Sequence, residues 1–498
     1  MSKIKLFKLF IYLCLNVFIA CSNGEIKENP IIDSDDLENS DTSEVYKGMA
    51  YLENSRLKLG VDLSLGGAVT YLSDEANGGK NMINSYDWGR QIQMSYYSGP
   101  RPYIGPNGER PTPEWAGLGW NPIQSGDAGG NRSKVISYEK RGDNAIFVRT
   151  IPMQWPHKSG IAGECVFECL YTLEDNVITM EATLVNDRKD KTQYPTTAQE
   201  MPAVYTNGPW YKLIAYLGDK PFTGEPTTVI VNKNDKKGWP WVHFYTPENW
   251  VALMDDNGYG IGVFQPEVMR FNGGFHPKDS FKGHGGEKDG QTGHIAPVGS
   301  QIIDHNIHLT YKTSLILGTL DDIRSYAKSN WQHNTNLEWS FQTSRNHWYF
   351  EGKIKDDGFP IKDGLNLQFE ENSSIIGPET FWKASEAPFL NIEGEFQTQN
   401  KTLDIIVEIQ PVSKSDFTDW LNWSEGEFSV EEERANKAFQ FPKKPSIIIK
   451  QTITADGIKQ KHKINLIGIS EYDGAMKNLK IKFSNNGSAK ISKISLVQ

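Results

Sequence analysis

Short apolar runs that alternate with polar residues recur along the chain between Tyr51 and Thr319. Gly, Pro, Asn and Asp separate the runs, and no convincing amphipathic helix interrupts them. The clearest unit is residues 165–185, in which two alternating segments flank the turn Glu174-Asp175-Asn176. This pattern predicts a β-hairpin with one buried face inside an all-β region. Further strands are predicted at residues 56–62, 68–72, 145–151, 227–231, 250–255, 260–265 and 302–313.

The first helix is predicted at residues 320–329, after the suitable N-cap Thr319. Asp321 and Asp322 favour the positive amino terminus of such a helix. Eight short strands are predicted after it, at residues 348–354, 365–369, 390–396, 403–409, 446–454, 462–468, 479–483 and 491–497. We therefore expect a large β domain at 49–318, a helix and linker at 319–345, and a smaller jelly-roll or β-sandwich at 346–498.

The amino terminus has the pattern of an export signal. Three lysines at positions 3, 5 and 8 precede an apolar stretch that ends at Ala20, so residues 1–20 are predicted to be a signal peptide. The sequence around Ala20-Cys21 resembles the lipobox of bacterial lipoproteins, although Phe18 departs from the usual Leu. We expect Cys21 to carry a lipid anchor; an ordinary signal peptide cut near the same point is the alternative.

The segment after Cys21 is predicted to be a flexible tether. Residues 22–48 are rich in Asp and Glu and poor in aromatic residues, so they cannot bury a core. This composition resembles that of surface-exposed lipoproteins of Bacteroidota. The expected location is therefore the outer membrane, facing the periplasm or the cell surface.

Composition narrows the functional classes. The chain of 498 residues has 52 basic and 62 acidic residues and a net charge of −10, which disfavours nucleic acid as a partner. Its 14 Trp, 20 Tyr and 23 Phe are too many for a disordered chain. Cys165 and Cys169 share one predicted strand, where they lie too far apart to form a disulfide with each other. We expect two buried thiols rather than a zinc site, and neither a metal nor a cofactor.

Two segments carry a family resemblance. Residues 171–178 (Tyr-Thr-Leu-Glu-Asp-Asn-Val-Ile) and 183–187 (Thr-Leu-Val-Asn-Asp) resemble the central hairpin of galactose-mutarotase-like β-supersandwich domains, and residues 66–72 resemble their glycine-led opening strand. The resemblance implies a β-supersandwich across residues 50–318. In aldose 1-epimerases a histidine-rich segment follows the hairpin and a glutamate near the domain end serves as base. Here residues 195–202 hold no histidine and residues 302–318 hold no matching glutamate, which argues against mutarotase activity. Longer blocks resemble secreted Bacteroidota proteins of polysaccharide-degradation gene sets.

Polar and aromatic residues suited to binding sugars cluster in three stretches, at 88–127, 200–241 and 276–294. Arg can hold a carboxylate or sulfate, and aromatic rings offer flat faces to sugars. A glycosidase needs two carboxyl groups, and Glu200 is flanked by apolar neighbours that could raise its pKa. The glycine-rich third stretch contains His276, His284 and His294, any of which could transfer protons. The candidate catalytic residues are Glu200, His284 and Asp127. The candidate substrate-binding residues are Arg90, Gln93, Tyr97, Trp115, Tyr205, Trp241 and His276.

On an extended strand, Arg90 would share a face with Ile92 and Met94, opposite Gln91 and Gln93. We expect the three stretches to converge on one cleft. The predicted function is that of a lipid-anchored glycoside hydrolase acting on a polysaccharide or oligosaccharide, with a carbohydrate-binding-module-like domain at residues 346–498. A polysaccharide lyase with a Tyr or His base, a non-catalytic glycan-binding lipoprotein and a structural lipoprotein are the alternatives.

Overall fold

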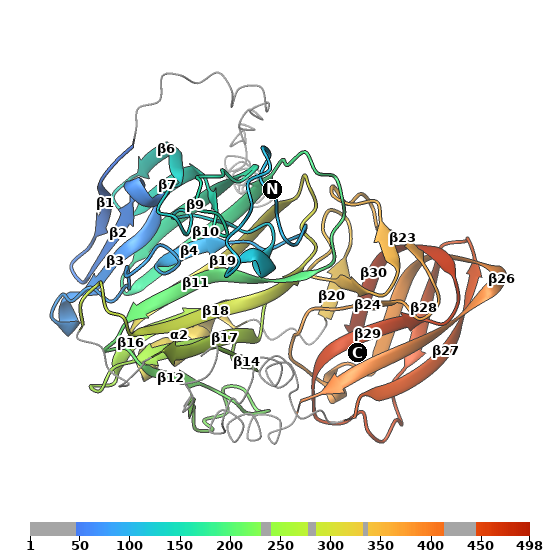
Figure 1. The fold of residues 1–498 in the computed structure, drawn as a ribbon. Helices are drawn as coiled ribbons and strands as arrows, with labels where there is room; N and C mark the ends of the chain where they lie inside the picture. The colour runs from blue at the N-terminus through green and yellow to red at the C-terminus, as the bar shows by residue number, and fades with distance from the viewer. Residues whose placement is uncertain (1–45, 231–240, 277–284, 332–336, 413–444) are drawn as a thin grey trace, which may run out of the picture. The chain divides into compact units, whose positions relative to one another are not determined.

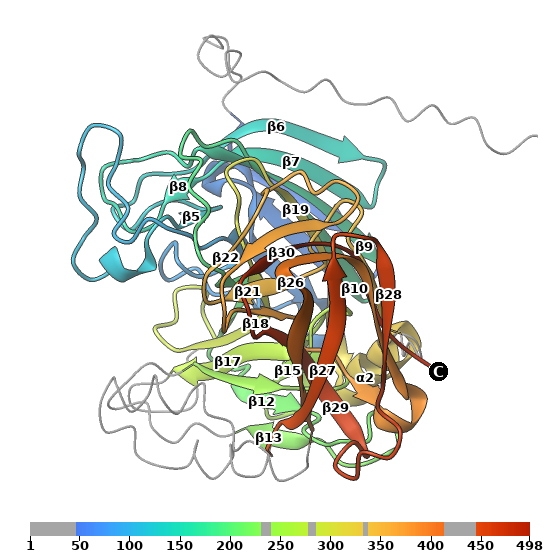
Figure 2. The ribbon, with the colours of Figure 1, turned by 90° about the vertical axis from the view of Figure 1, so that its right-hand side faces the viewer.

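The computed structural model describes residues 46–230, 241–276, 285–331, 337–412 and 445–498, which form the strands shown in Figures 1 and 2. The predicted signal peptide and nearly all of the tether, including Cys21, lie outside these residues. No helix in the described part of the chain is long and apolar enough to span a bilayer.

The first sheet has ten strands and contains the hydrogen-bonded path β1-β2-β3-β4-β11-β18-β17-β14, with β5 joined to β4 and β8 joined to β5. Its centre is formed by β4, β11 and β18, which pair in antiparallel register. The path strands are β1 (Met49–Glu53), β2 (Leu57–Asp62), β3 (Ala68–Asp74), β4 (Ile92–Ser95), β11 (Thr197–Asn207), β18 (Thr292–Gln301), β17 (Arg270–His276) and β14 (Val242–Tyr245); the added strands are β5 (Pro122–Ile123) and β8 (Met153–Gln154).

The second sheet has nine strands in the order β13-β12-β15-β16-β19-β10-β9-β7-β6. The predicted hairpin is confirmed, because β9 and β10 pair from Val177↔Glu174 to Asn186↔Cys165. The strands are β6 (Lys134–Arg141), β7 (Ala145–Ile151), β9 (Cys165–Glu174), β10 (Val177–Asn186), β12 (Lys212–Ala215), β13 (Thr228–Ile230), β15 (Trp250–Met254), β16 (Tyr259–Phe264) and β19 (His308–Thr319).

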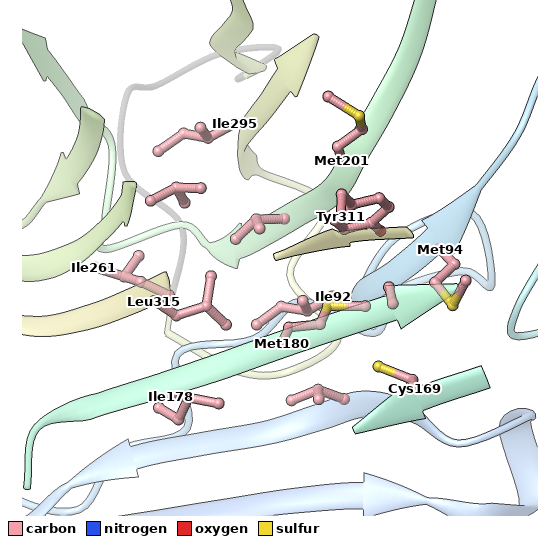
Figure 3. Close-up of a cluster of buried hydrophobic side chains, with 14 of the residues drawn as sticks. Ile92, Met94, Cys169, Ile178, Met180, Met201, Ile261, Ile295, Tyr311 and Leu315 are labelled. Carbon is pink, nitrogen blue, oxygen red and sulfur yellow. The ribbon is translucent and has the colours of Figure 1, made fainter. Parts of the chain in front are cut away.

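Apolar side chains of both sheets form one core. In β10 every second residue from Ile178 to Leu184 is buried, as the alternation predicts. These side chains meet apolar residues of the first sheet, such as Ile92 and Ile295, in the cluster drawn in Figure 3. Cys165 and Cys169 are free thiols buried in this core, and burial raises the pKa of Cys169 to about 12. Both behave as the small apolar residues that the sequence predicts.

Helix α2 (Leu320–Asn330) begins where predicted, because Thr319 and Asp322 form a capping box. Its buried residues Ile323 and Ala327 pack on the second sheet, in a cluster with Trp250 and Ile316.

The third sheet has eleven strands and a core of its own. The predicted strands at 390–396 and 403–409 are one continuous strand, and the predicted strand at 348–354 is two. The strands are β20 (Leu337–Ser340), β21 (Tyr349–Glu351), β22 (Ile354–Asp356), β23 (Leu365–Phe369), β24 (Ser374–Ile376), β25 (Trp382–Lys383), β26 (Phe389–Pro411), β27 (Ile447–Asp456), β28 (Gln460–Asn465), β29 (Ala475–Phe483) and β30 (Gly487–Val497). The all-β fold that the sequence predicts is thus confirmed.

A buried ion network joins the segment before β19 to the segment around β22. Arg345 donates to Asp304 Oδ2 at 2.6 Å and to both carboxylate oxygens of Asp356, at 2.6 and 2.9 Å. Gln193 donates to one oxygen of each aspartate. The carboxylates and the guanidinium therefore satisfy each other inside the protein.

Candidate functional site

A cavity of about 360 Å³ lies over the centre of the first sheet, where β4 and β11 pair. This volume suits a small ligand or one part of a longer chain. Residues of all three predicted stretches line it, the third through Thr292 alone. The lining consists of Asp87, Gly89, Arg90, Gln93, Ser95, Tyr97, Trp115, Leu118, Asn121, Ile123, Trp155, Glu200, Ala203, Tyr205, Trp241 and Thr292.

Glu200 reaches the cavity from a central strand. It lies opposite Ser95 of β4 and Val298 of β18. The pairing register shifts directly after it, between Glu200 and Val204. Such a bulge re-aims side chains, and here Glu200 lines the cavity whereas its neighbour Met201 is buried in the core.

The Glu200 carboxylate has one contact on each oxygen. Tyr97 donates to Oε2 at 2.9 Å, and His294 Nε2 lies 3.4 Å from Oε1. Burial alone would raise the pKa of Glu200, but the contact and charge of His294 and the Tyr97 hydroxyl together outweigh it and hold the pKa below its usual value. Glu200 is therefore a carboxylate at neutral pH, and the raised pKa expected for it from its apolar neighbours is absent.

His294 is completely buried beside Glu200. Its ring lies 4.5 Å from the ring of Tyr205 and 5.0 Å from that of Trp241, measured between centroids. Tyr205 is also its partner in the β11–β18 register. The two aromatic rings therefore fix the orientation of the imidazole that faces the carboxylate.

Tyr97 and Tyr205 are proton donors rather than bases. Removal from water raises the pKa of both phenols well above the ordinary value, and the charge of Glu200 raises each further. Both side chains line the cavity. They can donate hydrogen bonds to a ligand or to Glu200, but they do not ionise near neutral pH.

Arg90 lies on the cavity side together with Gln93, not with Ile92 and Met94 as the alternation predicts. The reason is Gln91, whose φ of 86° interrupts the extended backbone just before β4 begins. The side chain of Gln91 is buried and donates to the Asp87 carbonyl at 2.7 Å, which stabilises this conformation.

Asp87 is a second carboxylate at the cavity, which the residue pattern did not single out. Its Oδ2 lies 3.2 Å from Arg90 Nε, and its Oδ1 accepts the Gly89 amide at 2.9 Å. Arg90 also donates to the carbonyls of Asp289 and Gly290, at 3.3 and 3.2 Å. The guanidinium is therefore held at the cavity with a balanced charge.

Aromatic rings form much of the cavity wall. Trp115 and Trp155 lie 5.7 Å apart between centroids, and Tyr205 and Trp241 lie 6.2 Å apart. Trp155 was not among the predicted residues. These rings offer apolar faces beside polar groups, as a sugar-binding site requires.

The side chains of two predicted residues, Asp127 and Gln93, are hydrogen-bonded to other parts of the protein. Asp127 does not line the cavity: it is buried, and its carboxylate accepts four hydrogen bonds, from the amides of Gly129, Asn131 and Gly160 and from the Asn131 side chain. The predicted catalytic role of Asp127 is therefore not supported by its position. Gln93 lines the cavity, but its side chain is bonded to Ser125 and to backbone carbonyls.

Of the predicted histidines of the third stretch, the structure describes the backbone of His276 but not His284. The backbone of His276 pairs with Thr292, which lines the cavity, and His284 lies outside the described residues. Within the described ranges, no group of His, Cys, Asp and Glu could hold a metal ion.

Comparison with known proteins finds similarity in structure only. No family model and no curated protein matches the sequence. A galactose mutarotase-like protein from Lactobacillus casei is 13% identical with a TM-score of 0.36; the match covers 54% of this chain and 100% of that one. A galactose mutarotase related enzyme from Lactobacillus acidophilus is 10% identical with a TM-score of 0.33, covering 54% and 97%.

A GH36 α-galactosidase from Geobacillus stearothermophilus is 9% identical with a TM-score of 0.32, covering 57% of this chain and 42% of that one. Galactose mutarotase-like structures are thus among the matches. The function is therefore inferred from the chemistry of the cavity.

Proposed function

We propose that this protein is a carbohydrate-active enzyme, a glycoside hydrolase that binds a sugar unit in the cavity and uses Glu200 as base or nucleophile. The observation that carries the proposal is the lowered pKa of Glu200 in a cavity walled by aromatic rings. An ionised carboxylate attacks the sugar or activates water. Tyr97 and His294 would hold it in place.

Hydrolysis also needs a proton donor for the leaving group. Asp87 and Glu200 are the two acidic residues among the described residues that line the cavity. Asp87, which forms an ion pair with Arg90, would be the acid.

Glycan binding without hydrolysis is the second candidate function. It is favoured by the ion pair between Asp87 and Arg90, which already engages the other acidic residue of the described cavity lining. A lyase is supported less well, because a tyrosine base must ionise, whereas Tyr97 and Tyr205 have raised pKa values.

The test is a screen of the purified protein on marine and plant polysaccharides. New reducing ends without absorbance from unsaturated uronates would support hydrolysis, and that absorbance would indicate a lyase. The hydrolase proposal fails if the protein binds a glycan but releases no product, or if Glu200→Gln retains the activity.

We further propose that the protein is exported and anchored by lipid on Cys21, and that residues 346–498 bind carbohydrate. The first proposal is supported by the Ala20-Cys21 junction and the acidic segment after it. The second is supported by a polar depression over β23, β26 and β30.

A further inference from the structure

The third sheet has a polar groove far from Glu200 in sequence. Two cavities, of about 230 and 1120 Å³, share the lining residues Gln368, Gln397 and Ser488 and so form one depression. It lies over β22, β23, β30 and β26, which are neighbours in the sheet.

The groove is lined by two rows of side chains across three strands. Gln368 and Gln397 both pair with Ser488, and Asn366 and Glu395 both pair with Lys490. Leu367, between them, also lines the smaller cavity, but its side chain is buried in the core of this sheet. Directly opposed residues of neighbouring strands lie about 4.5–5.5 Å apart, so two of these side chains can bond neighbouring hydroxyls of one sugar ring.

The six groups have no partner of their own. Within the described residues, none of their side chains forms a hydrogen bond or an ion pair, although Glu395 and Lys490 are opposite each other. Polar groups in a depression without partners on the protein are available to a ligand.

The chemistry of the lining selects the ligand. Amides, a hydroxyl, a carboxylate and an ammonium both donate and accept, as sugar hydroxyls do. The charges of Glu395 and Lys490 cancel, so the two rows do not favour an acidic polymer. A peptide strand usually binds a free sheet edge, whereas the backbones of β23 and β30 are paired on both sides.

We propose that this groove is a second glycan-binding site, which holds a neutral polysaccharide by hydrogen bonds while the cavity at Glu200 acts on one of its units. We rest the choice of a glycan partly on the proposed function. The larger part of the groove alone has a volume of about 1120 Å³, which leaves room for more than one sugar unit.

The test measures binding separately from turnover. The full-length protein carrying Glu200→Gln is titrated with neutral xylan, galactomannan, laminarin and dextran, and with acidic alginate. Adding Gln368→Ala and Lys490→Ala should weaken binding of a neutral polymer at least about tenfold, because several hydrogen bonds are lost. Both side chains lie outside the core, so the melting temperature should not change.

The matched control is Lys450→Ala with Gln451→Ala, which removes the same two residue types from exposed positions of β27 outside the groove. It should leave the affinity unchanged. Trp115→Ala, in the cavity, should affect turnover of short substrates more than retention of the polymer.

The groove proposal is overturned if the groove variant binds like its control, if only alginate binds, or if no polymer binds. Wild-type turnover of short substrates would then show that the proposed function still holds. Loss of turnover in Glu200→Gln is measured separately, so the two failures can be distinguished.

Discussion

Replacing Arg345 by methionine is expected to destabilise the protein by about 3–5 kcal/mol. The side chains of Arg345, Asp304 and Asp356 are only 6%, 4% and 1% exposed. Hydrogen bonds and charge from the two aspartates raise the pKa of Arg345 even though burial acts in the opposite direction. Arg345→Met would leave two buried carboxylates without a counter-charge, which is the costly way to break a buried ion pair.

The decrease in melting temperature that this loss of about 3–5 kcal/mol causes depends on how many residues unfold together. Unfolding entropy is about 2.1 cal/mol/K per residue, so a unit of about 150 residues should melt about 10–15 °C lower. If the compact unit 45–498 unfolds together, the decrease should be only about 3–5 °C. The shift therefore also tests whether the two predicted β domains on either side of residues 319–345 unfold separately.

Thermal and urea denaturation of wild type and variant give both quantities. Arg141→Met is the control, because the Arg141–Glu139 pair is exposed and should contribute no more than about 1 kcal/mol. Adding Asp304→Asn and Asp356→Asn to Arg345→Met should restore much of the lost stability, because the uncompensated charges are removed. A loss below about 1 kcal/mol for Arg345→Met alone would refute the reasoning.

Three further outcomes are expected. Glu200→Gln should lower turnover by about 10²-fold or more, whereas Glu164→Gln, whose carboxylate accepts from Tyr103 outside the cavity, should not; equal effects would contradict the catalytic role. Tyr97→Phe removes a hydrogen bond that lowers the pKa of Glu200, so that pKa should rise and the acidic limb of the kcat/KM profile should move to higher pH; an unmoved limb would exclude Glu200 as the titrating group. Cys21→Ser should release the protein from membranes, and fractionation that still finds it there would rule out the lipid anchor.

Patterns among neighbouring residues of the sequence predicted the position of one strand and the start of the helix. Strand β7 has the predicted bounds of residues 145–151, and α2 begins at its predicted cap. The expected strand at 302–313 is instead β19, at His308–Thr319. Ile302 and Ile303 are buried without being part of a strand. An apolar run therefore predicts buried side chains, but it does not by itself predict that the backbone pairs with another strand.

The site could be predicted by residue type but not by geometry. The sequence indicated Glu200 and the aromatic residues, because carboxylates and rings suit sugar chemistry. The turn at Gln91 that moves Arg90 to the cavity depends on a contact with Asp87. The role of Asp127 depends equally on a distant partner, Gly160. Neither contact produces a periodic pattern of residue types in the sequence, so the pattern could not predict it.

Glu200 lies in the middle of a sheet, and this position affects how easily its backbone can open to solvent. Amides of β11 are bonded to β4 on one side and β18 on the other, so their hydrogen exchange should require opening of the sheet core. The Trp115 segment is a loop beside a 3-10 turn and is free of such pairing. Sequence changes there would reshape the wall of the cavity, while the carboxylate of Glu200 would keep its position in the sheet.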